Sequence, residues 1–168
     1  MDDARDLWLP DGRLVRVRSL RPGDREIYER AVLDLSPRSR YLRFLAPIHK
    51  PSERLLDLMT HPDGSRHVAH IALTPDETTG VAVVRYVRAE DDPLAAEVAI
   101  AVADDWQGHG LGAELVRRTA AHARASGVRT LRATTLRENA GSLRLLAATG
   151  FTPAGADGLH STHEARLT

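Results

Sequence analysis

One segment, residues 97–127, constrains the fold more than any other part of the chain. It begins with an apolar, strand-like run and continues into a loop in which Gly108, Gly110 and Gly112 stand at alternate positions. From residues 111–126 the apolar side chains recur at helical spacing, which predicts an amphipathic helix with one buried face. A strand that leads through a glycine-rich loop into such a helix predicts a fold in which helices cover a sheet.

The start of this predicted helix is a candidate site for a phosphate group. A helix start leaves backbone N–H groups without partners and carries a partial positive charge, and glycines let the backbone approach a ligand. The glycines could also serve only to turn the chain into the helix. A dinucleotide fingerprint fits poorly, because it should open a domain and the next strand ends at residues 134–136 without an acidic residue. A P-loop is excluded because no Gly-Lys-Ser/Thr is present.

The N-terminal half of the chain mixes a hairpin, helices and a meander. Residues 7–18 predict a hairpin around Asp11-Gly12, whose second strand exposes arginines on one face. Three helical segments follow between residues 24 and 60, and Asp24 is placed to cap the first of them. Three strands joined by short turns then form an antiparallel meander. We expect these strands at residues 67–73, 80–88 and 95–102.

The C-terminal half predicts a β-α-β-α-β arrangement. After the long helix, residues 128–136 alternate as a strand, residues 139–149 form a short helix, and an extended segment starts at Phe151. We therefore expect an α+β fold with a central, mostly antiparallel mixed sheet flanked by helices. The length is typical of one domain, so residues 1–168 are expected to form a single unit.

Composition and charge exclude several functions. Without cysteine there is no disulfide, thiolate zinc site or sulfur nucleophile. Lys+Arg 23 balances Asp+Glu 23, so we expect no nucleic acid and no membrane as partner. The acidic start, residues 1–6, and the lack of a long apolar run predict a cytoplasmic protein. We expect no metal, because His67 and His70 would point to opposite faces of a strand and His160 and His163 lie in a polar tail.

Two motifs at a fixed separation resemble those of the GNAT superfamily of N-acyltransferases. Residues 107–112, Gln-Gly-His-Gly-Leu-Gly, match the coenzyme A motif Gln/Arg-x-x-Gly-x-Gly/Ala at every fixed position. Asn139 and the later Gly150-Phe151 match a second motif. The resemblance covers about residues 14–155, and residues 36–44 are further similar to the substrate-side helices of bacterial protein lysine acetyltransferases.

The resemblance implies acetyl-CoA as co-substrate, with no metal. The backbone of the strand would bind the pantetheine arm like an added strand, and N–H groups of the loop would hold the pyrophosphate. Asn139 would contact the arm or cap its own helix, and the residue alone leaves both roles open. The implied cofactor-binding residues are Ile100, Ala101, Val102, Gln107, Gly108, His109, Gly110, Leu111, Gly112, Ala113 and Asn139.

Glu97 is the expected catalytic residue. An amine attacks a thioester only when it is neutral, so a general base must remove a proton, and the resemblance places the catalytic glutamate at this position. An exposed strand glutamate without a catalytic role is the alternative. Many relatives carry a tyrosine acid where this chain has Leu146, so water, or no dedicated acid, must serve. Tyr41 and Tyr86 are the other tyrosines considered for this role, and each fits a packing role better.

The acceptor is expected to be an amine, and the likeness of residues 36–44 favours a protein lysine. Arg38, Arg40, Tyr41 and Arg43 are the candidate substrate-binding residues, with the arginines forming a local basic patch. A small-molecule amine acetyltransferase and a non-catalytic acyl-CoA-binding sensor module are the alternatives. A monomer and a homodimer are both compatible with the sequence.

Overall fold

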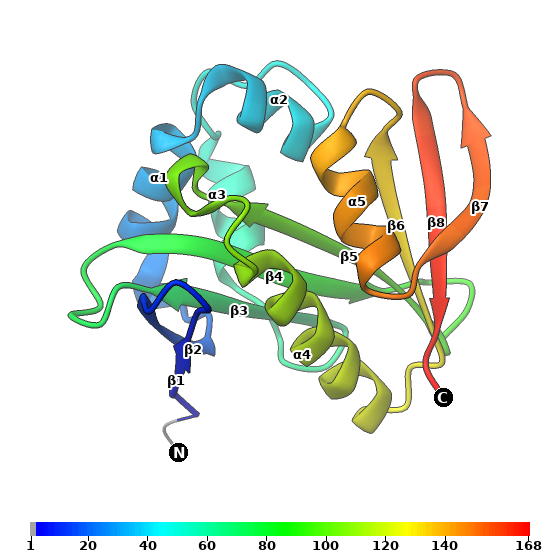
Figure 1. Cartoon of the computed structure of the whole chain (residues 1–168), viewed down its shortest axis with the longest axis horizontal. Helices are drawn as coiled ribbons and strands as arrows, with labels where there is room; N and C mark the ends of the chain where they lie inside the picture. Colours follow the sequence, from blue (N-terminus) through cyan, green and yellow to red (C-terminus); the bar gives the residue numbers. More distant parts are fainter. Residues whose placement is uncertain (1–2) are drawn as a thin grey trace.

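The computed structural model describes residues 3–168, so Met1 and Asp2 of the acidic start lie outside the described residues. The described chain forms an α+β fold around an 8-stranded sheet of order β1-β2-β3-β4-β5-β6-β8-β7 (Figure 1). Its ladders are antiparallel except for the parallel pair β5–β6. This confirms the expected mixed, mostly antiparallel sheet. The strands are β1 (Arg5–Trp8), β2 (Leu14–Ser19), β3 (His67–Leu73), β4 (Gly80–Arg88), β5 (Ala95–Val102), β6 (Thr130–Leu136), β7 (Thr152–Asp157) and β8 (His160–Arg166).

Helices cover both faces of the sheet. They are α1 (Arg25–Asp34), α2 (Pro37–Phe44), α3 (Glu53–Thr60), α4 (Leu111–Ala125) and α5 (Ala140–Ala148), with the short 3-10 turns η1 (Pro22–Asp24) and η2 (Asp104–Trp106). In Figure 1 α4 and α5 lie in front of the sheet, whereas α1 and α3 lie behind it. On β4 the alternation of side chains serves both layers, since Tyr86 joins the core under α4 and Val83 joins the core under α1 and α3.

The C-terminal end differs from the expected single extended segment. Residues 152–166 form the hairpin β7–β8, and β8 pairs with β6, so it lies between β6 and β7 in the sheet. His160 and His163 therefore belong to a strand rather than to a tail. The strand was missed because only His163 and Ala165 of β8 are buried, which leaves it without the run of apolar residues that marks the other strands.

Two expectations about the N-terminal half were wrong, and one ion pair explains both. Arg18 on β2 is buried rather than exposed, and its Nη1 and Nη2 each donate to the Asp24 carboxylate at 2.8 Å. That carboxylate also accepts from the N–H of Arg21, so it binds Arg18 and the preceding turn instead of capping α1. Burial alone would raise the pKa of Asp24, but the hydrogen bonds from Arg18 and Arg21 lower it.

The two histidines of β3 lie on opposite faces, as their spacing predicts. His67 Nε2 contacts Arg85 at 2.8 Å on one face, while the ring of His70 lies 5.4 Å from the ring of His122 on α4. Among residues 3–168 no group of three or more His, Cys, Asp or Glu side chains is arranged to hold a metal ion.

Candidate active site

A cleft opens where the two parallel strands separate. β5 and β6 pair only at residues 95–97 with 130–132 and diverge beyond that point. A pocket of about 540 Å³ lies between them, lined by residues of both strands, the glycine loop, α5 and α2. Residues 98–102 of β5 line this pocket and have no strand partner on the β6 side, so their backbone groups are available to an extended ligand. The predicted Ile100, Ala101 and Val102 are part of this wall. We call this pocket the β5–β6 cleft.

The glycine loop brings the start of α4 to one end of the β5–β6 cleft. Gly108 and Gly110 have φ values of +76° and +87°, which residues other than glycine rarely adopt. Gly110 is the N-cap of α4 and offers no side-chain cap, so the first N–H groups of the helix lack a partner from it. A Cβ on Gly112 would lie 3.5 Å from Leu145 and 3.8 Å from Val102, so a larger side chain would fill the cleft here. This arrangement fits a phosphate group at the helix start.

The other residues between positions 107 and 113 contribute differently from the glycines. The Gln107 side chain donates to the carbonyl of Val102 at 3.0 Å, which fastens the loop to the end of β5. His109 Nδ1 lies 3.1 Å from the Asp11 carboxylate, and the Leu111 side chain is fully buried, so neither side chain lines the cleft. Ala113 does line it, in the first turn of α4. Ligand contacts of His109 and Leu111 are therefore predicted only for their backbone N–H groups.

The turn of the β1–β2 hairpin supports the loop, a contact that sequence reasoning missed. The Arg13 guanidinium lies 4.2 Å from the centre of the Trp106 ring and donates to the carbonyl of Asp105 at 3.3 Å. Asp11 accepts from Arg13 Nε at 2.9 Å. The Asp11-Gly12 signal predicted the hairpin, but nothing in its local pattern showed which later segment it would touch.

Asn139 fulfils the structural role that was left open for it. Its Oδ1 accepts from the N–H of Ser142 at 3.0 Å, so it caps α5, and the same residue lines the β5–β6 cleft. Arg144, one turn further on, is an exposed cation at the wall of the cleft that sequence reasoning missed. The available signal was that Arg144 follows Asn139 by five residues, on the short helix that Asn139 begins. Leu146 lines the cleft as a buried core residue and brings no hydroxyl there.

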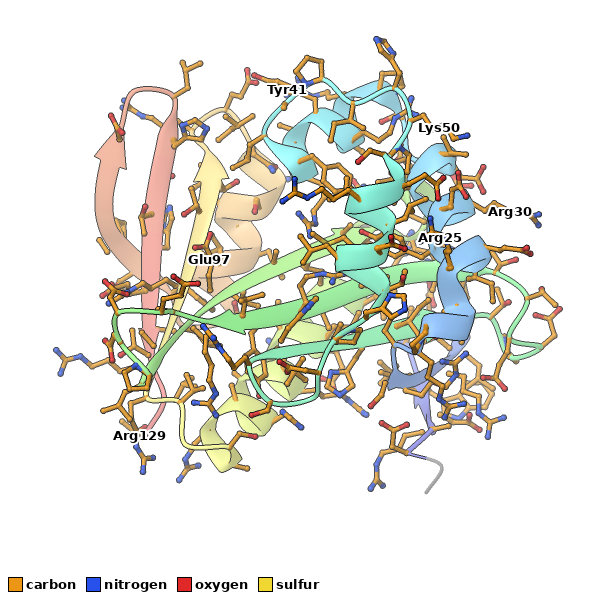
Figure 2. All side chains as sticks on the ribbon, turned by 180° about the vertical axis from the view of Figure 1, so that it is seen from behind. Arg25, Arg30, Tyr41, Lys50, Glu97 and Arg129 are labelled. Atoms are coloured by element: carbon orange, nitrogen blue, oxygen red, sulfur yellow. The ribbon has the colours of Figure 1, made fainter. Side chains whose placement is uncertain are left out.

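Glu97 marks the closed end of the β5–β6 cleft. It is the last residue of β5 that pairs with β6, opposite Arg132, and its neighbour Val98 already lines the cleft. Val98 packs into the core under α4, so the Glu97 side chain points to the other face of the sheet. It is exposed there, and Figure 2 shows it to one side of α2 and α3. Arg132 forms ion pairs with Asp92 and Glu164, so its charge is already matched.

The four candidate substrate-binding residues of α2 do not form a single patch. Arg38 is exposed, and Arg40 donates to the carbonyl of His49 at 2.9 Å. Tyr41 is half-buried and lies at the edge of the molecule in Figure 2. Arg43 lines the β5–β6 cleft, so only this arginine faces the site. Protein atoms around the Arg43 guanidinium lower its pKa by burial.

Comparison with known proteins agrees with this geometry. Residues 15–152 match the family model described as an acetyltransferase (GNAT) domain. The chain belongs to the GNAT acetyltransferase family. It is 36% identical over 151 residues to an acetyltransferase of Pseudomonas aeruginosa, a match that covers 87% of this chain and 81% of that protein. It is 30% identical to the acetyltransferase Pat of Mycolicibacterium smegmatis over 76% of this chain, but this match covers only 38% of Pat.

Solved structures of the family share the fold. The GNAT domain of S. lividans PAT superposes with a TM-score of 0.92 at 30% identity, over 98% of this chain and 97% of that one. The yncA protein of Salmonella typhimurium, solved with acetyl-CoA, superposes with a TM-score of 0.70 at 19% identity, over 92% of this chain and 94% of that one. As a GNAT acetyltransferase, the chain is an acyltransferase that uses acetyl-CoA. No helix within residues 3–168 has the length and apolar character to cross a membrane.

Proposed function

We propose that this GNAT domain transfers an acetyl group from acetyl-CoA to the side-chain amine of a protein lysine, with Glu97 as the general base. The observation that carries the proposal is the position of Glu97. It lies where β5 and β6 separate, at the opposite end of the cleft from the free N–H groups of α4. A ligand held along β5 from that helix start would therefore lead toward the carboxylate.

The residues of the β5–β6 cleft fit acetyl-CoA. When bound, acetyl-CoA supplies a thioester as the acyl donor. The unpaired edge of residues 98–102 would take the pantetheine arm, and the N–H groups at the start of α4 would take the pyrophosphate. Gly112 leaves the room that a side chain would fill, and Arg144 adds a cation that can reach a phosphate. Asn139 caps α5 and presents its amide to the same space.

Glu97 can act on the acceptor from the side of the sheet opposite α4. A lysine amine has a reference pKa of about 10.4, so at neutral pH it must lose a proton before it can attack. An exposed carboxylate next to the cleft can take that proton through a water molecule. Among the tyrosines considered, Tyr86 is fully buried and its hydroxyl bonds His122 Nδ1 at 3.1 Å, which leaves it in a packing role. Because Leu146 stands in the family's tyrosine position, we assign no protein acid to protonate the leaving CoA thiolate. Water would supply that proton.

One observation supports a protein lysine as acceptor. Residues 36–44 resemble the substrate-side helices of bacterial protein lysine acetyltransferases. These residues form α2, whose inner side lines the β5–β6 cleft through Ser39, Leu42 and Arg43. An acceptor that reaches Glu97 would therefore pass α2.

The test replaces Glu97 by glutamine, which keeps the shape and removes the basicity. We expect acetyl-CoA to bind with unchanged affinity while turnover of a lysine peptide at pH 7 falls about 10²- to 10⁴-fold. The loss should shrink from pH 7 toward pH 10, because a growing share of the amine is then already neutral. The matched control is Glu90→Gln, which changes an exposed glutamate whose ion pair with Arg66 spans 3.9 Å. Less than a threefold loss in Glu97→Gln at pH 7 contradicts the assignment of the base.

A further inference from the structure

Arg85 is a buried cation without a counter-charge. It lies in the middle of β4 and is 3% exposed. Its Nη1 donates to the carbonyl of Met59 at 2.9 Å and contacts His67 Nε2 at 2.8 Å, while its Nε and Nη2 are buried without a hydrogen-bond partner. Within residues 3–168 no carboxylate pairs with it. The nearest compensation is the ring of Tyr28, whose centre lies 5.7 Å from the guanidinium carbon.

A second arginine faces the same space. Arg43 of α2 and Arg85 both line a cavity of about 30 Å³ between α1, α2 and the sheet, together with Tyr28, Val83 and Ala101. We call this cavity the arginine pocket. Arg43 and Ala101 also line the β5–β6 cleft, so the two cavities meet there. Burial, together with the charge of Arg43, lowers the pKa of Arg85 to about 10, although Tyr28 acts in the opposite direction.

Two neighbouring guanidinium groups in such a place need an anion. A buried charge costs several kcal/mol unless it is paired and hydrogen-bonded, and here two like charges are brought together with donors left free. The arginine pocket has room for about two water-sized groups, and a carboxylate presents two oxygen atoms to a guanidinium fork. We propose that Arg43 and Arg85 bind a carboxylate of the acceptor, so that the domain selects amines carrying a carboxylate. This proposal rests on the transferase function proposed above.

The sheet register places this carboxylate near the reaction site. Arg85 pairs with Ala99 of β5, and Glu97 is two residues before Ala99 on the same face. The Cα atoms of diagonal neighbours of this kind, here Arg85 and Glu97, are about 7–8 Å apart. The acceptor should therefore hold its carboxylate several bonds away from the amine. A lysine side chain with its own free carboxylate fits this separation, and so does a peptide lysine beside a glutamate.

The test compares matched acceptors with and without a carboxylate. One pair is L-lysine and L-lysinamide, and the other is a short blocked peptide with Glu-Lys and its Gln-Lys analogue. For the wild-type domain we expect kcat/KM at least tenfold higher for the carboxylate member of one pair, mainly through KM. The first pair reports a free amino acid, and the second an acidic side chain in a protein. In Arg85→Met and in Arg43→Met the ratio of the two kcat/KM values should fall to about one. In Arg85→Met, whose side chain does not line the β5–β6 cleft, the KM for acetyl-CoA should stay unchanged.

The control is Arg30→Met, which changes an arginine on the outer side of α1 that points away from the body of the molecule in Figure 2. It should keep the wild-type ratio. Arg85→Met should also fold at least as stably as the wild type without ligand, since it removes an uncompensated buried charge. If Arg85→Met does not fold, Arg43→Met on α2 gives the same comparison. The proposal is overturned if the wild-type domain shows a kcat/KM ratio near one for both acceptor pairs. It is also overturned if both arginine variants keep the wild-type ratio.

A binding measurement separates this proposal from the proposed transfer reaction. The same acceptor pairs are titrated calorimetrically into the domain in the presence of CoA, which has no acetyl group to give. Tighter binding of the carboxylate member that is lost in Arg85→Met, combined with no turnover of any of these acceptors when acetyl-CoA is supplied, supports the arginine pocket and overturns the proposed acetyl transfer to lysine. Turnover without any preference for a carboxylate supports the transferase and overturns the arginine pocket.

Discussion

Replacing Gly110 by leucine tests the phosphate-binding role of the α4 start, and Gly127 provides a matched control. Both glycines flank the same helix and have left-handed φ values, +87° and +92°. A Cβ would find nothing closer than 3.8 Å at Gly110 and nothing within 4 Å at Gly127. Each substitution should therefore cost only the backbone strain, about 1–2 kcal/mol. In a domain of this size that lowers Tm by roughly 2–8 °C in both variants.

The two variants should differ once acetyl-CoA is added. A ligand that binds only the native state stabilises it by about 2.7 kcal/mol at a hundredfold excess over its Kd, which is roughly 5–11 °C in Tm for a domain of this size. Differential scanning fluorimetry with and without acetyl-CoA should show this shift in the wild type and in Gly127→Leu. It should disappear in Gly110→Leu, because Gly110 is the N-cap of α4 and lines the β5–β6 cleft, so a large side chain there would crowd the ligand beside the N–H groups. A Tm shift of wild-type size in folded Gly110→Leu refutes the phosphate-binding role of the α4 start. Loss of the Tm shift in Gly127→Leu refutes it as well.

Two further predictions concern the parts that support the site. Asp24→Asn should destabilise the domain by about 1–3 kcal/mol, because it weakens the buried pair with Arg18, which keeps Glu77 as a charged partner. Since the native pKa of Asp24 is lowered, its stabilisation is present above the unfolded pKa of about 3.9 and is lost as pH falls through the native value. When Tm is measured from pH 2 to 7, the values of the wild type and Asp24→Asn should converge at the acid end. A Tm difference that stays constant with pH contradicts this. Arg13→Met removes the cation from the Trp106 ring and should raise the Kd for acetyl-CoA about two- to fivefold by calorimetry; an unchanged Kd means that the hairpin does not position the loop.

Much of the fold could be predicted because its elements carry local signals. The three meander strands have the bounds that alternation and turn residues predict, and the long helix begins at Leu111 as its apolar spacing requires. The signal for the glycine loop is also local, since the strand, the glycines and the helix follow one another in the chain. β8 could not be recognised in the same way, because most of its side chains are polar and half-exposed. Its place between β6 and β7 depends on pairing across the chain.

The site itself was predicted unevenly, for a related reason. The residues predicted to bind the cofactor follow from motifs, and most of them line the β5–β6 cleft. The predicted acceptor side depends instead on which way single side chains of α2 point. Nothing in the spacing distinguishes Arg43, which faces the cleft, from Arg38, which is exposed. Arg85 did carry a signal that was not used. It stands in an otherwise apolar strand, residues 81–87, where a charge is costly unless something pairs with it.

The most direct test of the account follows both products of one reaction. Purified domain, acetyl-CoA and a lysine peptide with a neighbouring glutamate are incubated at neutral pH, and free CoA thiol and acetylated peptide are quantified together. We predict that thiol and acetyl-lysine appear in equal amounts, well above the enzyme-free reaction, and that Glu97→Gln suppresses both. Binding of acetyl-CoA without either product above the enzyme-free reaction, across lysine peptides and small amines alike, contradicts the account and identifies the β5–β6 cleft as a binding site alone.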